Sequence, residues 1–240
     1  MNRLTGISLA AAVLAGCLSC SSKAPQTAAA IANPHDLSGV WQIAQPMQAL
    51  QTVDGKAPPL TADAQKTYDA RRAATRAGDN SWDDAAKCKP PGEPRTLFEN
   101  GWPFQIGQND KRVTFMFQWN SAVRVVEMGL KLPDFAGPFF FGKSSGRWDG
   151  DTLVVDVIGI REEVALDSTG LPHTEDLKLT ERFRLIDADT LEARLHFDDA
   201  ATFTQAWDAV LTFKRQPETA IVEDHCLDRL NLPNSYRPTL

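Results

Sequence analysis

The sequence predicts a mainly β fold, an antiparallel up-and-down barrel with one helix in its N-terminal part. From Pro103 onward, apolar and polar residues alternate with a period of two, which is the pattern of half-buried strands. Turn residues separate these runs at short intervals, and no strand-helix-strand pattern indicates a parallel sheet. We therefore expect eight or nine antiparallel strands, with a two-sheet β-sandwich as the alternative.

Two hairpins set the expected strand register. Asp149-Gly150 is a two-residue turn signal, and pairing across it places Trp148 beside Leu153 and Val155 on one face. A loop at residues 187–189 pairs apolar residues across the next hairpin: Leu185 with Leu191, Phe183 with Ala193 and Leu179 with Phe197. On the other face this register pairs opposite charges: Arg184 with Glu192 and Lys178 with Asp198. Charged pairs suit a solvated face, so we expect the apolar face to line the interior.

One helix is expected between the first strand and the long run of strands. Thr61 is a suitable N-cap, and the helix should continue to Ala77 and stop at Gly78. Its apolar face is mostly alanine, supplemented by Leu60 and Tyr68, which is too little for a central core helix. We expect the helix to pack outside the barrel or across one end.

The N-terminus has the layout of a secretory signal. A positive charge at Arg3 precedes an apolar stretch, residues 4–16, that is shorter than the roughly twenty residues needed to span a bilayer. The stretch ends in Leu14-Ala15-Gly16-Cys17, which resembles the lipobox of bacterial lipoproteins. This resemblance implies that residues 1–16 are a signal peptide and that lipid on Cys17 attaches the protein to a membrane. An ordinary cleaved signal with a coincidental cysteine is the alternative.

The remainder divides into a tether and one domain. Residues 17–35 are rich in Ala, Ser, Pro and Gln without apolar periodicity, which predicts a flexible tether. Residues 36–240 are expected to form a single β-rich domain. Leu18 follows the cysteine where inner-membrane retention signals usually carry Asp, so by analogy the expected location in the bacterial cell envelope is the outer membrane.

Charge and cysteine content narrow the function classes. The formal net charge is −6 and no basic run occurs, which argues against nucleic acid as a partner. An exported protein meets an oxidising environment, so a disulfide between Cys88 and Cys226 is expected, with two free buried thiols as the alternative. No Cys-x-x-Cys pair or histidine pair at ligand spacing suggests a metal site, and no phosphate-binding loop or dinucleotide fingerprint suggests a cofactor.

Two resemblances to known families concern the domain itself. Gly39-Val40-Trp41 resembles the Gly-x-Trp element of lipocalins, whose tryptophan closes one end of a calycin barrel, although the insertion at residues 46–102 departs from the lipocalin plan. The second resemblance, to a family of exported bacterial proteins of unassigned function, covers nearly the whole mature domain. Its motifs are DLSGVW at 36–41, CKPPGEPR at 88–95, PFQI at 103–106, GRWDGDTLVVD at 146–156, LDSTGLPHTEDLKLTERFR at 166–184 and the late Cys226.

The loop at residues 161–176 gathers the candidate catalytic residues Asp167, His173 and Glu175. A histidine oriented by a carboxylate can act as a general base near neutral pH. A hydrogen-bonded turn without catalytic function is the alternative. In the strand that follows, Glu181 shares the interior face with apolar residues, so it should pair with an arginine or be protonated. The candidate partners are Arg147, Arg124 and Arg95.

Aromatic residues suggest where a ligand would bind. Trp102, Phe139, Phe140 and Phe141 are expected to line an apolar cavity, with Arg147 as a charged contact. Ordinary core packing is the alternative. The leading hypothesis is a lipid-anchored barrel that binds a small, largely apolar molecule. The alternatives are a metal-free acid-base enzyme (an isomerase, lyase or hydrolase) that uses Asp167, His173, Glu175 and Glu181, and an assembly lipoprotein with a protein partner. The sequence leaves the oligomeric state open.

Overall fold

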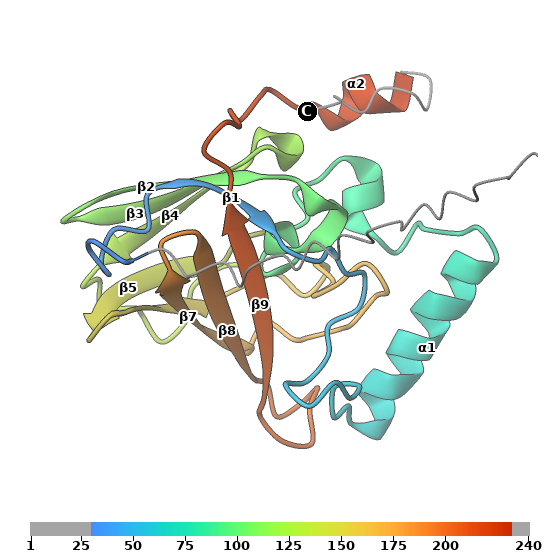
Figure 1. Cartoon of the computed structure of the whole chain (residues 1–240). Coiled ribbons are helices and arrows are strands. Elements are labelled where there is room, and N and C mark those ends of the chain that lie inside the picture. Colours follow the sequence, from blue (N-terminus) through green and yellow to red (C-terminus); the bar gives the residue numbers. More distant parts are fainter. Residues whose placement is uncertain (1–29, 232–240) are drawn as a thin grey trace, which may run out of the picture.

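The computed structural model describes residues 30–231, which form a closed barrel of nine sequentially ordered strands (Figure 1). The expected signal peptide, Cys17 and residues 17–29 of the expected tether lie outside the described residues. The strands are β1 (Gly39–Ile43), β2 (Phe104–Asn109), β3 (Arg112–Phe117), β4 (Val123–Met128), β5 (Lys143–Asp149), β6 (Thr152–Ile158), β7 (Lys178–Asp187), β8 (Thr190–Asp198) and β9 (Trp207–Arg215).

The prediction of a mainly β barrel is confirmed, but the prediction of purely antiparallel pairing is wrong at one place. Strands β4 and β5 are parallel, with Val126 beside Ser144 and Met128 beside Gly146. Residues 129–142 carry the chain back along the barrel, so β5 starts at the end where β4 starts. The sandwich alternative is wrong, because β1 pairs with β9 and closes a single sheet.

Both predicted hairpins are confirmed. Trp148 lies opposite Leu153 and shares its face, as expected, but Asp149 pairs with Thr152, so the turn residues are Gly150 and Asp151, one position later than predicted. The β7–β8 hairpin pairs Leu185 with Leu191, Phe183 with Ala193, Leu179 with Phe197, Arg184 with Glu192 and Lys178 with Asp198, as expected. The inner face of this hairpin is buried at each apolar position, and the charged pairs lie outside.

Helix α1 (Ala62–Arg76) follows β1, close to its predicted limits. The hydroxyl of Thr61 accepts a hydrogen bond from the amide of Ala64 and so caps the first turn. The amide of Thr61 donates to Thr202 and that of Thr204 to Pro59, which fixes the start of the helix to the β8–β9 connection (Figure 1). Helix α1 therefore lies at the end of the barrel where β6 and β8 finish, called here the α1 end.

Short helices complete the described chain. They are the 3₁₀ helices η1 (Asp84–Lys87), η2 (Arg95–Leu97), η3 (Glu99–Gly101) and η4 (Trp119–Ser121) and the α-helix α2 (Cys226–Asn231). Within residues 30–231, neither α-helix is long and apolar enough to cross a membrane. The predicted disulfide is confirmed, because Cys88 and Cys226 are bonded, and it fastens α2 to the segment after η1.

Trp41 on β1 is fully buried, and its indole donates a hydrogen bond to the carbonyl of Leu37. The guanidinium of Arg215, the last residue of β9, lies 4.2 Å from the centre of the Trp41 ring. The same guanidinium donates to the carbonyls of Ser38 and Ala188. A Cβ at Gly39 would stand 2.5 Å from Arg215 Nη1, and Gly39 has a φ of +127°, so this close approach requires glycine. The lipocalin family itself stays a prediction.

Candidate functional site

A charged cluster is buried inside the barrel. Arg124 on β4 and Glu181 on β7 point inward, as alternation along their strands requires. Arg124 donates to Glu181 through both terminal nitrogens, at 3.1 and 2.5 Å, and its Nε lies 3.2 Å from the hydroxyl of Ser144. Of the three arginines considered as partners for Glu181, Arg124 is therefore the one that binds it.

The second carboxylate of this cluster comes from an irregular segment. Residues 91–99 are buried throughout: Leu97 and Phe98 belong to the core, and Gly92 lies against Val164 of the loop that follows β6. From this segment Glu93 reaches Arg124, with Oε1 3.1 Å from Nη1, and all three charged side chains of the cluster are at most 2 % exposed. Neither carboxyl oxygen of Glu93 makes a hydrogen bond of good geometry with a described residue.

Two carboxyl groups therefore share one guanidinium. Burial raises the pKa of Glu93 well above its usual value, and the neighbouring Glu181 raises it further, although Arg124 opposes the shift. We assign the shared negative charge to Glu181, which has the bidentate contact with Arg124, and a proton to Glu93. With this assignment the cluster is electrically neutral, as an apolar interior favours.

An aromatic cluster surrounds these charges. Arg124 lies 5.5 Å from the centre of the Phe115 ring, and Phe115 in turn contacts Phe183 at 5.2 Å between ring centres. Phe104 contacts Phe115 and Phe117, and its ring meets Phe213 edge-on at 5.2 Å. The barrel interior is thus apolar and aromatic around a single ionic centre.

The structure places the predicted ligand-binding residues in different surroundings. Phe141 stacks on Phe117 of the interior, at 6.0 Å between ring centres. Phe140 lies under Arg161, and the half-buried Trp102 lies under the guanidinium of Arg229. Two of them lie on the surface: Phe139 is 54 % exposed, and Arg147 is on the outer face of β5, where it pairs with Asp156.

The predicted catalytic residues also separate. Asp167 is buried and accepts hydrogen bonds from the amides of Leu50, Thr169 and Leu171, so its carboxylate holds its own loop in shape. Glu181 belongs to the interior cluster, while Glu175 is half-buried. Among the described residues, no hydrogen bond links any of these three carboxylates to another one of them or to His173.

His173 lies beside a cleft of about 360 Å³ between α1 and the loops of the α1 end. The cleft is lined by Asp63, Ala64, Thr67, Arg71, Glu162, Glu163, Pro172, His173, Thr174, Ala201 and Thr202. His173 Nδ1 donates to the carbonyl of Thr174 at 2.7 Å, because a carbonyl can only accept. The neutral ring then has a bare Nε2, which is buried and has no hydrogen-bond partner among the described residues. Burial lowers the pKa of His173, although the backbone of Thr174 and Val164 and the charge of Asp199 oppose the shift.

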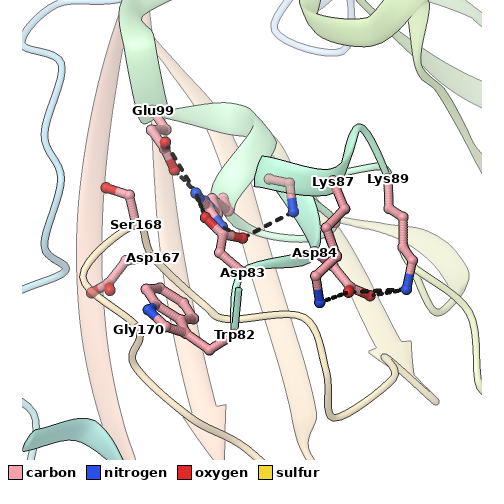
Figure 2. Close-up of polar contacts among 12 residues, drawn as sticks. Trp82, Asp83, Asp84, Lys87, Lys89, Glu99, Asp167, Ser168 and Gly170 are labelled. Atoms are coloured by element: carbon pink, nitrogen blue, oxygen red, sulfur yellow. Dashed lines mark hydrogen bonds and ion pairs between the residues drawn. The ribbon is translucent and has the colours of Figure 1, made fainter. Parts of the chain in front are cut away.

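A further buried arginine, which the sequence suggested only as a partner of Glu181, organises the segment before β2. Arg95 binds both oxygens of Asp83, at 2.7 and 2.8 Å, and also contacts Glu99 (Figure 2). Figure 2 also shows Lys87 and Lys89 on either side of Asp84. Each carboxylate thus has a cation, so this cluster stabilises the segment and leaves no group free for a ligand.

Comparisons with known proteins add no family. No protein-family model matches the chain, and no curated protein matches it. Within residues 30–231, no three His, Cys, Asp or Glu side chains gather in a group that could hold a metal ion.

Exchanging each buried carboxyl for an amide tests the charge assignment. Glu181→Gln should lower the free energy of unfolding at pH 7 by about 1.5–3 kcal/mol, because Arg124 loses a charge-assisted hydrogen bond. Glu93→Gln should change it by less than about 1 kcal/mol, because an amide resembles the protonated carboxyl.

The same assignment predicts a pH dependence. The wild type should lose stability as the pH rises above 4.5, because Glu93 then ionises in the unfolded chain and not in the folded one. Glu93→Gln should not show this pH-dependent loss of stability. Equal destabilisation by both variants in urea unfolding would contradict the assignment.

The buried histidine should give the protein a separate acid sensitivity. Folded His173 resists protonation, so stability is complete above the unfolded pKa of 6.5 and decreases as the pH falls below it. One proton contributes a slope of at most about 1.4 kcal/mol per pH unit. His173→Gln should remove this component while His35, His196 and His225 remain as internal controls. Identical pH profiles for the wild type and His173→Gln, measured by urea unfolding, would show that His173 does not cause the loss.

Proposed function

We propose that this chain is a lipid-anchored protein of the bacterial cell envelope that binds a small, largely apolar molecule at the α1 end of its barrel. The observation that carries the proposal is the cleft of about 360 Å³ at that end, which lies against a closed barrel with an aromatic interior. Its volume falls within the range of about 300–1,000 Å³ typical of small-molecule sites.

The α1 end suits this function better than the barrel interior does. The barrel interior is occupied by the side chains of the protein itself. The aromatic rings contact one another, and residues 91–99 are buried. The cleft lies between a helix and two loops, which makes it accessible without unfolding a strand. Ala64, Pro172 and Ala201 give it apolar surface. The polar groups that could orient a ligand are Arg71, His173, three threonines and the carboxylates of Asp63, Glu162 and Glu163.

The membrane anchor is a separate part of the proposal. Its support is the sequence Leu14-Ala15-Gly16-Cys17 after an apolar stretch of signal length. We expect a clickable fatty acid to label the full chain in a bacterial host and not to label Cys17→Ser. Fractionation should place the labelled chain in the outer membrane. An unlabelled wild type would remove the anchor and leave the ligand proposal intact.

Thermal unfolding of the mature chain with a library of hydrophobic compounds tests ligand binding. At least one compound should raise the melting temperature, because a ligand that binds only the folded state stabilises it by mass action. Thr67→Trp should abolish the shift by filling the cleft from α1. Ala73→Trp is the matched control, since it adds the same side chain at an exposed position of the same helix that does not line the cleft.

Each result has a distinct meaning. If a compound still raises the melting temperature of Thr67→Trp, the ligand binds outside the cleft, which contradicts the proposed location. No shift by any compound would contradict ligand binding. The acid-base enzyme and the assembly lipoprotein stay predictions from the sequence, with His173 at the cleft as the residue for the enzyme alternative.

A further inference from the structure

Exposed apolar side chains concentrate on β4 and on the connection that follows it. Phe135 and Phe139 are 66 % and 54 % exposed, and Val123 and Val125 are 56 % and 41 % exposed. Within residues 30–231, Phe135 and Phe139 are the two aromatic side chains among the exposed large hydrophobic ones. Exposed apolar side chains on a strand and on the connection that follows it suggest an interaction surface.

The connection at residues 129–142 is held firmly against the barrel. The amide of Phe139 donates to the carbonyl of Gly159, and the amide of Arg161 donates to the carbonyl of Phe139. The hydroxyl of Ser145 on β5 donates to the carbonyl of Leu130. A Cβ at Gly159, which has a φ of +69°, would stand 1.4 Å from the carbonyl oxygen of Ala136. The backbone is thus anchored at both ends, and the exposed rings stand on a fixed support.

The parallel pairing connects this segment with the outer face of β4. Val126 and Ser144 are paired and buried, so Val125 and Lys143, which precede them, both point outward and lie side by side. Lys131 and Lys143 are exposed near the two ends of the connection, and neither forms an ion pair with any described residue. The surface therefore combines exposed phenylalanine and valine with two exposed lysine side chains.

We propose that this surface, made of Val123, Val125, Phe135 and Phe139 with Lys131 and Lys143, docks on the membrane to which the protein is anchored. The choice of a membrane as the occupant rests on the proposed lipid on Cys17. Ala30, the first described residue, comes thirteen positions after Cys17, so the tether spans at most about 45 Å. A domain on such a tether stays close to the bilayer in every orientation, and apolar rings flanked by lysines suit the boundary between headgroups and acyl chains.

Apolar contact must provide most of the attraction. The chain has a net charge of −6, and Asp134 lies between the two lysines, so electrostatic attraction to anionic lipids is weak. Transfer of a phenylalanine side chain out of water is favourable on its own. Binding should therefore occur on neutral phosphatidylcholine as well as on mixed phosphatidylethanolamine and phosphatidylglycerol, and it should depend little on salt.

Vesicle sedimentation of the mature chain with Cys17→Ser tests the surface without the anchor. In this background Phe135→Ser with Phe139→Ser should weaken binding to both kinds of vesicle by at least about tenfold, because two apolar side chains no longer insert. Val53→Ser with Ile186→Ser is the matched control, since it removes two other exposed apolar side chains, which are 58 % and 46 % exposed. The control variant should bind like its Cys17→Ser parent.

The outcomes separate this inference from the anchor and from ligand binding. Absence of vesicle binding by the Cys17→Ser chain would overturn it, and so would equal loss in the two paired variants. Circular dichroism of each variant shows whether the fold persists. Fatty-acid labelling and the thermal shift are measured independently, so failure of the docking surface leaves those two results unchanged.

Discussion

The guanidinium of Arg124 is the interaction on which the barrel interior depends. It joins β4 to β7 through Glu181, contacts β5 through Ser144 and meets Glu93 from the irregular segment at residues 91–99. Loss of one partner leaves the other charge without its charge-assisted hydrogen bonds and costs about 1.5–3 kcal/mol, so these strands stabilise one another. The segment itself is held by its apolar side chains, since Leu97 and Phe98 belong to the hydrophobic core, and Glu93 brings it within 3.1 Å of Arg124.

The two ends of the barrel differ in structure. The end opposite α1 carries the short hairpins β2–β3, β5–β6 and β7–β8, with His35 before β1 against Gly150 and Gln108. At the α1 end the chain uses a helix, a long loop at residues 159–177 and the buried segment, and here the cleft forms. Asp167 shapes the long loop through the amides of Thr169 and Leu171 and joins it to the amide of Leu50, so this carboxylate, which does not line the cleft, supports its wall.

The sequence was most informative where the contacts are local. The β7–β8 register, the N-cap of α1 and the inward direction of Glu181 follow from turn residues and alternation, and all agree with the structure. Alternation also excludes Arg147 from the interior, since its neighbour Trp148 faces inward with Leu153. The role of Glu93 was not predictable, because its proline-rich segment has no periodicity and its partners come from distant strands. The parallel β4–β5 pair was missed for a related reason, since residues 129–142 carry no signal for the direction in which they return the chain.

Strand β4 links the interior cluster to the outer surface through a single geometric constraint. Its sequence Val123-Arg124-Val125 would usually turn the valines inward and the arginine toward water. Here Arg124 must face inward to neutralise Glu181, and a period of two then forces both valines outward. The apolar exposure on β4 is therefore a direct consequence of the buried charge. An outer apolar surface costs least where water is excluded from it, and the bilayer of the proposed lipid anchor would provide that environment.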